Sequence, residues 1–394
     1  MKSRMKSLVS LLLALAVCLT AAFSLAEGQT LDLNQMSGEV LIAEAGNYTL
    51  TGSLNGHVLV DVGEGEVTLT LSGVNIASPD TAGLIAVSGS GLTVVLADGT
   101  ENTIADGGSD ETYDAAVISS VPLTFEGTGS LTVVGSNQEG ISTQNTDLTF
   151  NGGHYTVISQ DDGIGAGGDQ GGLLTFNGGS FSISASGDGI DSNASAVFNG
   201  AEIFVVGSAA GGDAGIDTDG GYTILSGTVV ALGSDMIETP GAQTTQATLA
   251  LTLDSTVAEG SQVQVVTAGG ETLAAFEAVQ SFRTLILSSA GLAGQTCSVL
   301  VNGEAVSAAG ETSFAMTDTV VSIGASGMGG HGGMGRMGFG GRPDGERPEL
   351  PEGAAPAEGM PEPPEGMGNP PEGMGNPPEG MPTPPDQQTG SAGT

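Results

Sequence analysis

Aspartates recur at a regular spacing in the middle of the chain, and carboxylates arranged in this way can hold a metal ion. The tripeptide Asp-Gly-Ile occurs at Asp162 and Asp188, and a variant with an inserted alanine begins at Asp213. Further Asp and Asn residues, of the type that forms tight turns, accompany each copy. Carboxylate and amide oxygens are the ligands that calcium prefers. The predicted calcium ligands are Asp161, Asp162, Asp188, Asp191, Asn193, Asp213, Asp217 and Asp219.

The motif belongs to a repeat. Its isoleucine and a second, mostly phenylalanine marker each recur about every 25 residues, and two markers that keep one approximate period indicate a repeat architecture. The first series is Ile141, Ile164, Ile190, Ile216 and Ile237, and the second is Phe125, Phe150, Phe176, Phe198 and Ile224.

Short runs of strand type make up each repeat. In HVLVDV, GLTVVLA and SFSISAS, apolar residues alternate with small or polar ones, and no stretch shows helical periodicity. Three short strands per period predict an all-β fold, a parallel β-helix of roughly eight coils that lie about 4.8 Å apart. Equivalent residues then stack into interior ladders. The expected ladders are Phe150, Phe176, Phe198 and Ile224, and Tyr155, Phe181, Ile203 and Val229.

Stacking would also bring the motif carboxylates together. If Asp162, Asp188 and Asp213 occupy one corner of successive coils, each lies within about 5 Å of the next. Like charges at that distance destabilise each other. Between Glu27 and Ser326 the only lysine or arginine is Arg283, outside the repeats. A bound cation would neutralise the stack; the alternative is that these aspartates are solvated turn formers that cap the corners.

Composition divides the chain into four regions. Residues 1–26 carry three basic residues, a long apolar run and a Ser-Leu-Ala end, which predicts a cleaved signal peptide and a secreted or cell-surface protein. Residues 27–242 hold the repeats. Residues 243–325 keep the strand pattern without the repeat, which predicts a β-rich cap or small β domain. Residues 326–394 are rich in Gly, Met, Pro and Glu, which predicts a disordered tail.

The charge of the processed chain and its apolar runs restrict the classes of binding partner, and its cysteine content predicts the state of its thiol. After signal cleavage the chain would carry 45 acidic residues against 4 arginines, a formal charge near −41. Such a surface repels nucleic acid and anionic lipid, so neither is an expected partner. No later apolar run approaches the roughly 20 residues that span a bilayer, so we expect no stable membrane insertion. Cys297 is the single cysteine of the processed chain, which predicts a free, buried thiol.

Several segments resemble one known family. GNYTLTGSL, LTLSGVNI, TENTIADG, DLTFNGGHYTV, SGDGIDSN and GIDTDGGYTILSGTVVALG are similar to the clostridial-type carbohydrate-binding, polysaccharide-lyase-like β-helix family, over roughly Gly46 to Gly324. The resemblance implies a right-handed, single-stranded parallel β-helix that binds cellulose or polygalacturonate and carries calcium, without established lyase activity. The positions that match the calcium-associated motif are Asp162, Asp188, Asp191 and Asp213, whereas Glu139 and Met236 depart from it.

Catalysis is the less favoured interpretation. Removal of the proton beside a uronate carboxylate needs a base, and calcium-dependent lyases generally use Lys or Arg, which the repeats lack. A hydrolase needs two paired carboxylates, and the aspartates here lie at glycine-bound corners. We therefore expect binding of an acidic cell-wall polysaccharide without turnover. The alternatives are a structural or adhesive surface protein with purely structural calcium and, third, a calcium-dependent lyase. The particular polysaccharide and the oligomeric state stay open.

Overall fold

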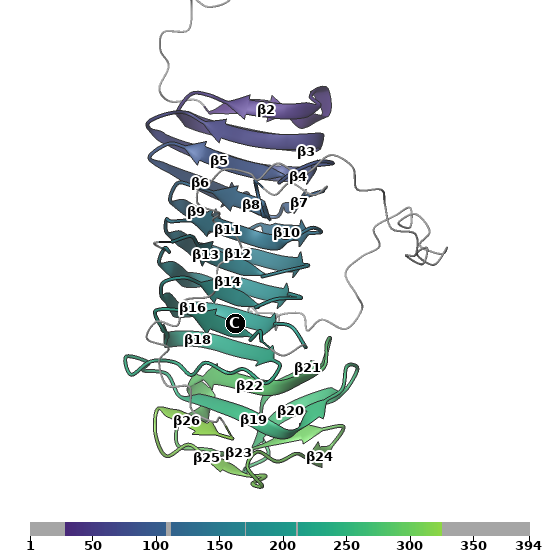
Figure 1. The fold of residues 1–394 in the computed structure, drawn as a ribbon, viewed down its shortest axis with the longest axis vertical. Coiled ribbons are helices and arrows are strands. Elements are labelled where there is room, and N and C mark those ends of the chain that lie inside the picture. The colour runs from purple at the N-terminus through teal and green to yellow at the C-terminus, as the bar shows by residue number, and fades with distance from the viewer. Residues whose placement is uncertain (1–27, 108–111, 170, 210–211, 325–394) are drawn as a thin grey trace, which may run out of the picture.

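The chain stacks its strands into a parallel β-helix. The computed structural model describes residues 28–107, 112–169, 171–209 and 212–324. The β-helix has about seven turns and runs from β2 (Gly38–Ile42), at the purple end of Figure 1, to β18 (Tyr222–Gly233). The fold class predicted from the sequence is confirmed. The estimate of roughly eight turns is slightly high because the coil in which Leu84 pairs with Val117 is longer than the sequence period.

The elements from Gln29 to Gly233 are strands of 3 to 16 residues and one 3₁₀ helix. They are β1 (Gln29–Asp32), η1 (Leu33–Gln35), β2 (Gly38–Ile42), β3 (Gly46–Asp61), β4 (Glu66–Ala77), β5 (Leu84–Ser88), β6 (Gly91–Leu96), β7 (Glu101–Ala105), β8 (Ala115–Ser119), β9 (Leu123–Gly127), β10 (Ser130–Gly135), β11 (Glu139–Gln144), β12 (Leu148–Ser159), β13 (Ile164–Gly167), β14 (Leu174–Ser184), β15 (Ile190–Ser192), β16 (Ala196–Val206), β17 (Ile216–Thr218) and β18 (Tyr222–Gly233).

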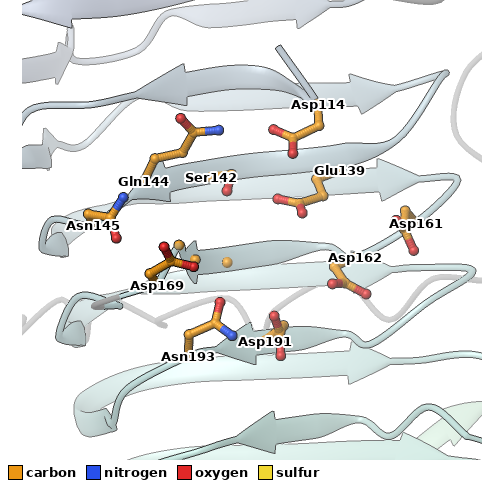
Figure 2. A pocket seen from close by; sticks show the side chains of 13 residues that line it. Asp114, Glu139, Ser142, Gln144, Asn145, Asp161, Asp162, Asp169, Asp191 and Asn193 are labelled. Atoms are coloured by element: carbon orange, nitrogen blue, oxygen red, sulfur yellow. The ribbon is translucent and has the colours of Figure 1, made fainter. Parts of the chain in front are cut away.

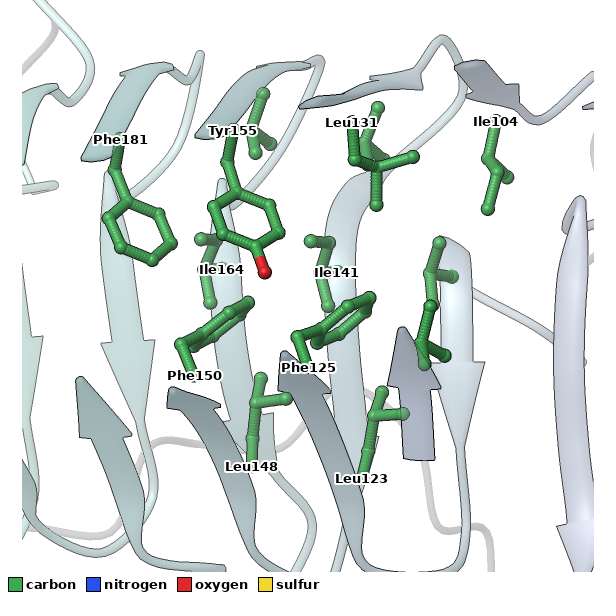
Figure 3. Close-up of a cluster of buried hydrophobic side chains, with 14 of the residues drawn as sticks. Ile104, Leu123, Phe125, Leu131, Ile141, Leu148, Phe150, Tyr155, Ile164 and Phe181 are labelled. Atoms are coloured by element: carbon green, nitrogen blue, oxygen red, sulfur yellow. The ribbon is translucent and has the colours of Figure 1, made fainter. Parts of the chain in front are cut away.

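The predicted phenylalanine ladder fills the interior. Phe150 of β12 pairs in parallel register with Phe125 of β9 and Phe176 of β14, and Phe176 pairs with Phe198 of β16. Ile224 of β18 continues the series. Consecutive rings stack with centroids 5.1 Å apart, and all are fully buried; Figure 3 shows two of them. Because the same position is filled turn after turn, the core is continuous along the axis.

The second predicted ladder packs against the first. Tyr155, Phe181, Ile203 and Val229 pair in register on β12, β14, β16 and β18. The Phe181 ring meets the Phe150 ring edge-on, with centroids 5.1 Å apart. The Tyr155 hydroxyl donates a hydrogen bond to the Gly152 carbonyl at 2.8 Å, so the phenol is satisfied inside the core. The strand alternation that turns Tyr155 inward leaves its neighbour His154 exposed.

The motif isoleucines form a third ladder and thereby position the aspartates. Ile141 of β11 pairs with Ile164 of β13, then Ile190 of β15 and Ile216 of β17 follow in register. All four are fully buried. Ile237 lies outside the strands and packs half-buried against the same core. The strands β11, β13, β15 and β17 therefore form one face of the β-helix, and their outward residues flank the motif.

Further strands cover the end of the last turn (Figure 1). β22 pairs antiparallel with both β18 and β19, so the parallel order stops there. A separate five-stranded sheet follows, and the region has its own hydrophobic core, in which Cys297 is free and buried, as predicted. The elements are β19 (Thr248–Val257), β20 (Gln262–Thr267), β21 (Thr272–Glu277), β22 (Phe282–Ser289), η2 (Ala290–Leu292), β23 (Thr296–Val301), β24 (Glu304–Ala305), β25 (Phe314–Ala315) and β26 (Val320–Ile323).

The predicted signal peptide, residues 1–26, and the predicted tail, residues 326–394, lie outside the described residues. The boundaries given above for the four regions stay predictions.

Candidate functional site

Backbone hydrogen bonds show which residues share the motif corner. The glycine of each motif donates its N–H to the carbonyl of the corner residue one coil further on, at 2.9–3.0 Å. The corner column that results is Glu139, Asp162, Asp188 and Ala214. The prediction that Asp213 stacks on Asp188 is therefore wrong. The inserted alanine takes the corner position and moves Asp213 one residue out of register.

The two corner aspartates join successive coils. The Asp188 N–H donates to Asp162 Oδ1 at 2.7 Å, and the Ala214 N–H donates to Asp188 Oδ1. Both side chains are buried, with 7% and 1% of their surface exposed. A Cβ atom on Gly187 would lie 2.4 Å from Asp162 Oδ1, so a side chain at this position would displace the Asp162 carboxylate. One oxygen of each carboxylate thus has a structural role, as the corner-capping alternative expects.

Three carboxylates converge on this corner. Asp162, Asp188 and Asp191 each offer an oxygen, and the three oxygens lie within 4.8 Å of one another. Asp191 joins them from β15, where it directly follows the buried Ile190. A hard cation such as calcium takes its ligands from carboxylate and carbonyl oxygens, so this donor set fits such an ion. These three aspartates are the residues that would hold it.

Burial and neighbouring negative charges raise the pKa of the Asp188 carboxyl, which lies between Asp162 and Ala214 in the corner column. Burial is the largest cause that raises the pKa of Asp188, to about 8. The hydrogen bond from the Ala214 N–H opposes the shift, while the negative charges of Asp162, Asp217 and Asp191 add to it. A raised pKa in a carboxyl means that the environment disfavours its charge. A cation at the corner would reverse that balance.

A pocket with a volume of about 440 Å³ opens on the same face. Figure 2 shows Asp114, Glu139, Asp162 and Asp191 on coils that follow one another down the view. Because Asp162 and Asp191 belong both to the pocket and to the group of three carboxylates, an ion held at the corner would border the pocket. The lining residues are Asp114, Glu139, Ser142, Gln144, Asn145, Asp161, Asp162, Gly165, Gly167, Gly168, Asp169, Asp191 and Asn193.

Two glycines of β13 form the floor. Gly165 pairs with Ser142 on one side and Asp191 on the other, and Gly167 pairs with Gln144. The neighbouring coils carry side chains at these positions, whereas β13 carries none, and this leaves a hollow in the surface. Neither glycine has a positive φ. A Cβ atom at Gly165 would have its nearest neighbour at 3.5 Å, and one at Gly167 at 3.4 Å, so both places have room for a side chain.

Asp114 and Glu139 belong to the pocket but were not among the predicted site residues. Glu139 occupies the corner column, where it was considered only as a departure from the motif; its register with Asp162 was the available signal. Asp114 precedes β8, outside the clear repeats. The pKa of Glu139 is raised well above its usual value by burial first, then by the Asp114 charge, with smaller contributions from Asp162 and Asp191 and opposition from a Ser142 hydrogen bond.

The other predicted ligands are divided. Asp161 and Asn193 line the pocket. Within the described residues, Asp213, Asp217 and Asp219 belong neither to the group of three carboxylates nor to the pocket lining. Asp217 lies one coil beyond Asp191 in register, and its negative charge contributes to the raised pKa of Asp188.

The fold and the site define a class, a parallel β-helix protein with an acidic pocket on one face. Residues 37–327 match the sequence model of a family described as carbohydrate-binding domain-containing protein. The chain therefore belongs to that family, and the resemblance found in the sequence is confirmed.

Two known proteins are similar to parts of this chain. A carbohydrate-binding domain-containing protein of Acetivibrio thermocellus is 38% identical over 128 residues, which are 30% of this chain and 44% of the relative. The match thus spans less than half of that relative's length. The solved structure of a polysaccharide lyase-like protein from C. thermocellum, a gadolinium derivative, is 30% identical, covers 50% of this chain and 90% of its own, and gives a TM-score of 0.41.

Among the residues that the structure describes, no helix is long and apolar enough to cross a membrane.

Proposed function

We propose that the protein binds cell-wall polysaccharide in the acidic pocket, without turnover, and that a calcium ion at Asp162, Asp188 and Asp191 bridges to the carboxylates of an acidic glycan such as polygalacturonate. The observation that carries the proposal is that two of the three converging carboxylates also line the pocket. Family membership supports a carbohydrate ligand. A neutral glucan such as cellulose would have to bind through its hydroxyl groups, since the pocket lining includes no aromatic side chain.

A cation resolves the conflict between an acidic pocket and an acidic ligand. The lining includes six carboxylic acids and no lysine, arginine or histidine. A uronate carboxylate that entered such a pocket alone would be repelled at every approach. A divalent ion already coordinated by the three aspartates can accept further oxygen ligands, since calcium takes six to eight. Acidic polysaccharide would then complete the coordination.

The lining also supports binding rather than elimination. Lys and Arg, the usual bases of calcium-dependent lyases, and the possible substitutes His and Tyr are absent from the residues that line the pocket. A purely structural ion is the second candidate. It is favoured by the hydrogen bonds through which Asp162 and Asp188 join successive coils. Secretion or surface display is part of the proposal and depends on the predicted signal peptide at residues 1–26.

The test is retention on immobilised polygalacturonate, with and without a calcium chelator, next to an insoluble neutral glucan. We expect retention on polygalacturonate that the chelator abolishes. Retention that ignores the chelator while calcium still stabilises the protein would leave the ion a structural role only. Absorbance of unsaturated uronate in the soluble fraction would instead show lyase activity.

A further inference from the structure

The pocket wall on the coils before Asp162, at Glu139 and Asp114, has its own polar groups. Asp114 Oδ1 and Glu139 Oε2 are buried and have no hydrogen-bond partner among the described residues. Three buried side-chain atoms in the described part of the chain share this property, and two of them lie on this one pocket wall. A buried acceptor without a donor costs about 1–3 kcal/mol, so two of them side by side call for a hydrogen-bond donor that the described residues do not supply.

The free oxygen of Glu139 borders the open floor. A Cβ atom built on Gly165 would lie 3.5 Å from Glu139 Oε2 and 3.7 Å from the Ser142 hydroxyl oxygen. A group bound in the space above Gly165 would therefore contact Glu139 Oε2 and the Ser142 hydroxyl. Figure 2 shows the Asp114 carboxylate on the coil next to Glu139, on the same side of the pocket.

The two floor glycines, Gly165 and Gly167, differ from the glycines of the Asp-Gly-Ile motif in what their positions require. A Cβ atom on Gly163 would lie 2.4 Å from the Gly189 carbonyl oxygen, and one on Gly189 would lie 2.2 Å from a Val205 methyl. Close packing therefore requires glycine at those two positions. At Gly165 and Gly167 neither packing nor φ requires it. At these two positions, glycine leaves open a space that a larger side chain would fill.

We propose that Asp114, Glu139 and the floor at Gly165 form a hydroxyl subsite, which accepts hydrogen bonds directly from neighbouring ring hydroxyls of the bound sugar. This inference rests on the proposed function and adds a second contact to it. The ion holds the sugar carboxylate, and the adjoining wall at Asp114 and Glu139 holds the ring. In polygalacturonate each internal residue has two adjacent free hydroxyls, and a carboxylate oxygen is a strong acceptor for such donors.

A second ion fits this end less well. Asp114 and Glu139 are two carboxylates that join no group of three among the described residues. Calcium requires six to eight oxygens, and the further oxygens next to the open space are the Ser142 hydroxyl and the Asp191 carbonyl, each 3.7 Å from a Cβ on Gly165, which leaves the set short of six. Hydroxyl donors satisfy both unpartnered oxygens without adding a charge.

The subsite is tested with Gly165→Ala, which places a methyl group in the open space, and with Glu139→Gln. The matched control is Gly91→Ala, because Gly91 also has no positive φ and its Cβ would lie 3.6 Å from the Pro122 carbonyl, on a strand outside the pocket. Affinity electrophoresis measures binding to polygalacturonate and to polygalacturonate acetylated on its ring hydroxyls, at saturating calcium. Calorimetry measures calcium binding to each variant.

We expect Gly165→Ala and Glu139→Gln to weaken polygalacturonate binding by roughly tenfold or more, with parent-like binding by Gly91→Ala and unchanged calcium stoichiometry. Acetylation should weaken binding to the parent to a similar extent. Parent-like binding by Gly165→Ala would overturn the subsite and leave the proposed function intact. Loss of one equivalent of calcium in Glu139→Gln would also overturn it, since the pair would then hold an ion. A parent protein that fails to bind polygalacturonate would contradict the proposed function and the subsite together.

Discussion

The Asp188 N–H donates a hydrogen bond to the Asp162 carboxylate at 2.7 Å across two successive coils. The same two side chains join Asp191 in the group of three carboxylates beside the pocket. The aspartates that tie the coils together are thus the ones that would hold an ion. Metal binding and the stability of the β-helix are therefore expected to be linked.

The first prediction concerns the ligands. Asp188→Asn keeps an oxygen for the Ala214 N–H but removes a charge, so calcium affinity should fall by roughly ten- to a hundredfold, since contacts to charged groups contribute about 1.5–3 kcal/mol. Asp213→Asn is the matched control, because Asp213 lies outside the group of three. Calorimetric titration of calcium measures both. Equal losses in the two variants would contradict the assignment of the corner.

The second prediction concerns pH. The pKa of Asp188 is about 8 in the folded protein without an ion, against about 3.9 in an unfolded chain. The folded state holds this proton more tightly than the unfolded chain does. Protonated Asp188 therefore stabilises the fold fully below about pH 4, and this contribution to the free energy of unfolding is lost as the pH rises through about 8. In chelator, the free energy of unfolding should therefore fall by up to about 1.4 kcal/mol per pH unit within this window from this group.

Urea denaturation at several pH values in chelator, for the parent and for Asp188→Asn, measures this slope. The pKa of Glu238 is also raised, to about 7, by burial first, so the variant should retain part of the decline. Saturating calcium should flatten the curve of the parent, and an ion at a hundredfold excess over its dissociation constant should add about 2.7 kcal/mol. Identical slopes for parent and variant in chelator would rule out Asp188 as the titrating group.

The third prediction concerns the core. Phe176 is fully buried between the stacked rings of Phe150 and Phe198, so Phe176→Ala should lower the free energy of unfolding by about 3–5 kcal/mol. Asn177→Ala is the neighbouring control. It removes two exposed side-chain hydrogen bonds, one to Asn151 and one from Asn199, each worth about 1 kcal/mol or less. Similar denaturation midpoints for the two variants would contradict the interior ladder.

The fourth prediction separates two kinds of glycine. Gly189→Ala should destabilise the protein by about 1–3 kcal/mol, because its Cβ would overlap a Val205 methyl at 2.2 Å. Gly165→Ala should leave the melting temperature close to that of the parent, because the nearest atom lies 3.5 Å away. Thermal denaturation in calcium compares them. Strong destabilisation by Gly165→Ala would mean that the floor glycine is structural.

The period and the interior ladders were predictable from the sequence, because a stacked coil repeats its buried side chains at equivalent positions. Phe150 and Phe176 therefore occur one period apart in the sequence, and their register follows. The same logic placed Asp162 and Asp188 correctly. It failed at Asp213 because a single inserted alanine changes the register without changing the appearance of the motif.

The pocket was not predictable in the same way. Asp114 reaches it from the longer coil in which Leu84 pairs with Val117, and that coil breaks the period. Gly165 contributes by lacking a side chain between Ser142 and Asp191, and a gap has meaning only when its neighbours on adjacent coils are known. Asp191 joins the corner aspartates from strand β15, directly after Ile190, and the motif spacing alone did not single it out from Asp217 or Asp219.

The most direct test of the account is polygalacturonate binding measured as a function of free calcium, for the parent and for Asp188→Asn. If the ion at Asp162, Asp188 and Asp191 bridges to the glycan, binding by the parent should rise along the same curve as calcium occupancy, and the curve of the variant should shift to higher calcium by the factor that its calcium affinity loses. Full binding by the parent in chelator, or an unshifted curve for the variant, would contradict the account.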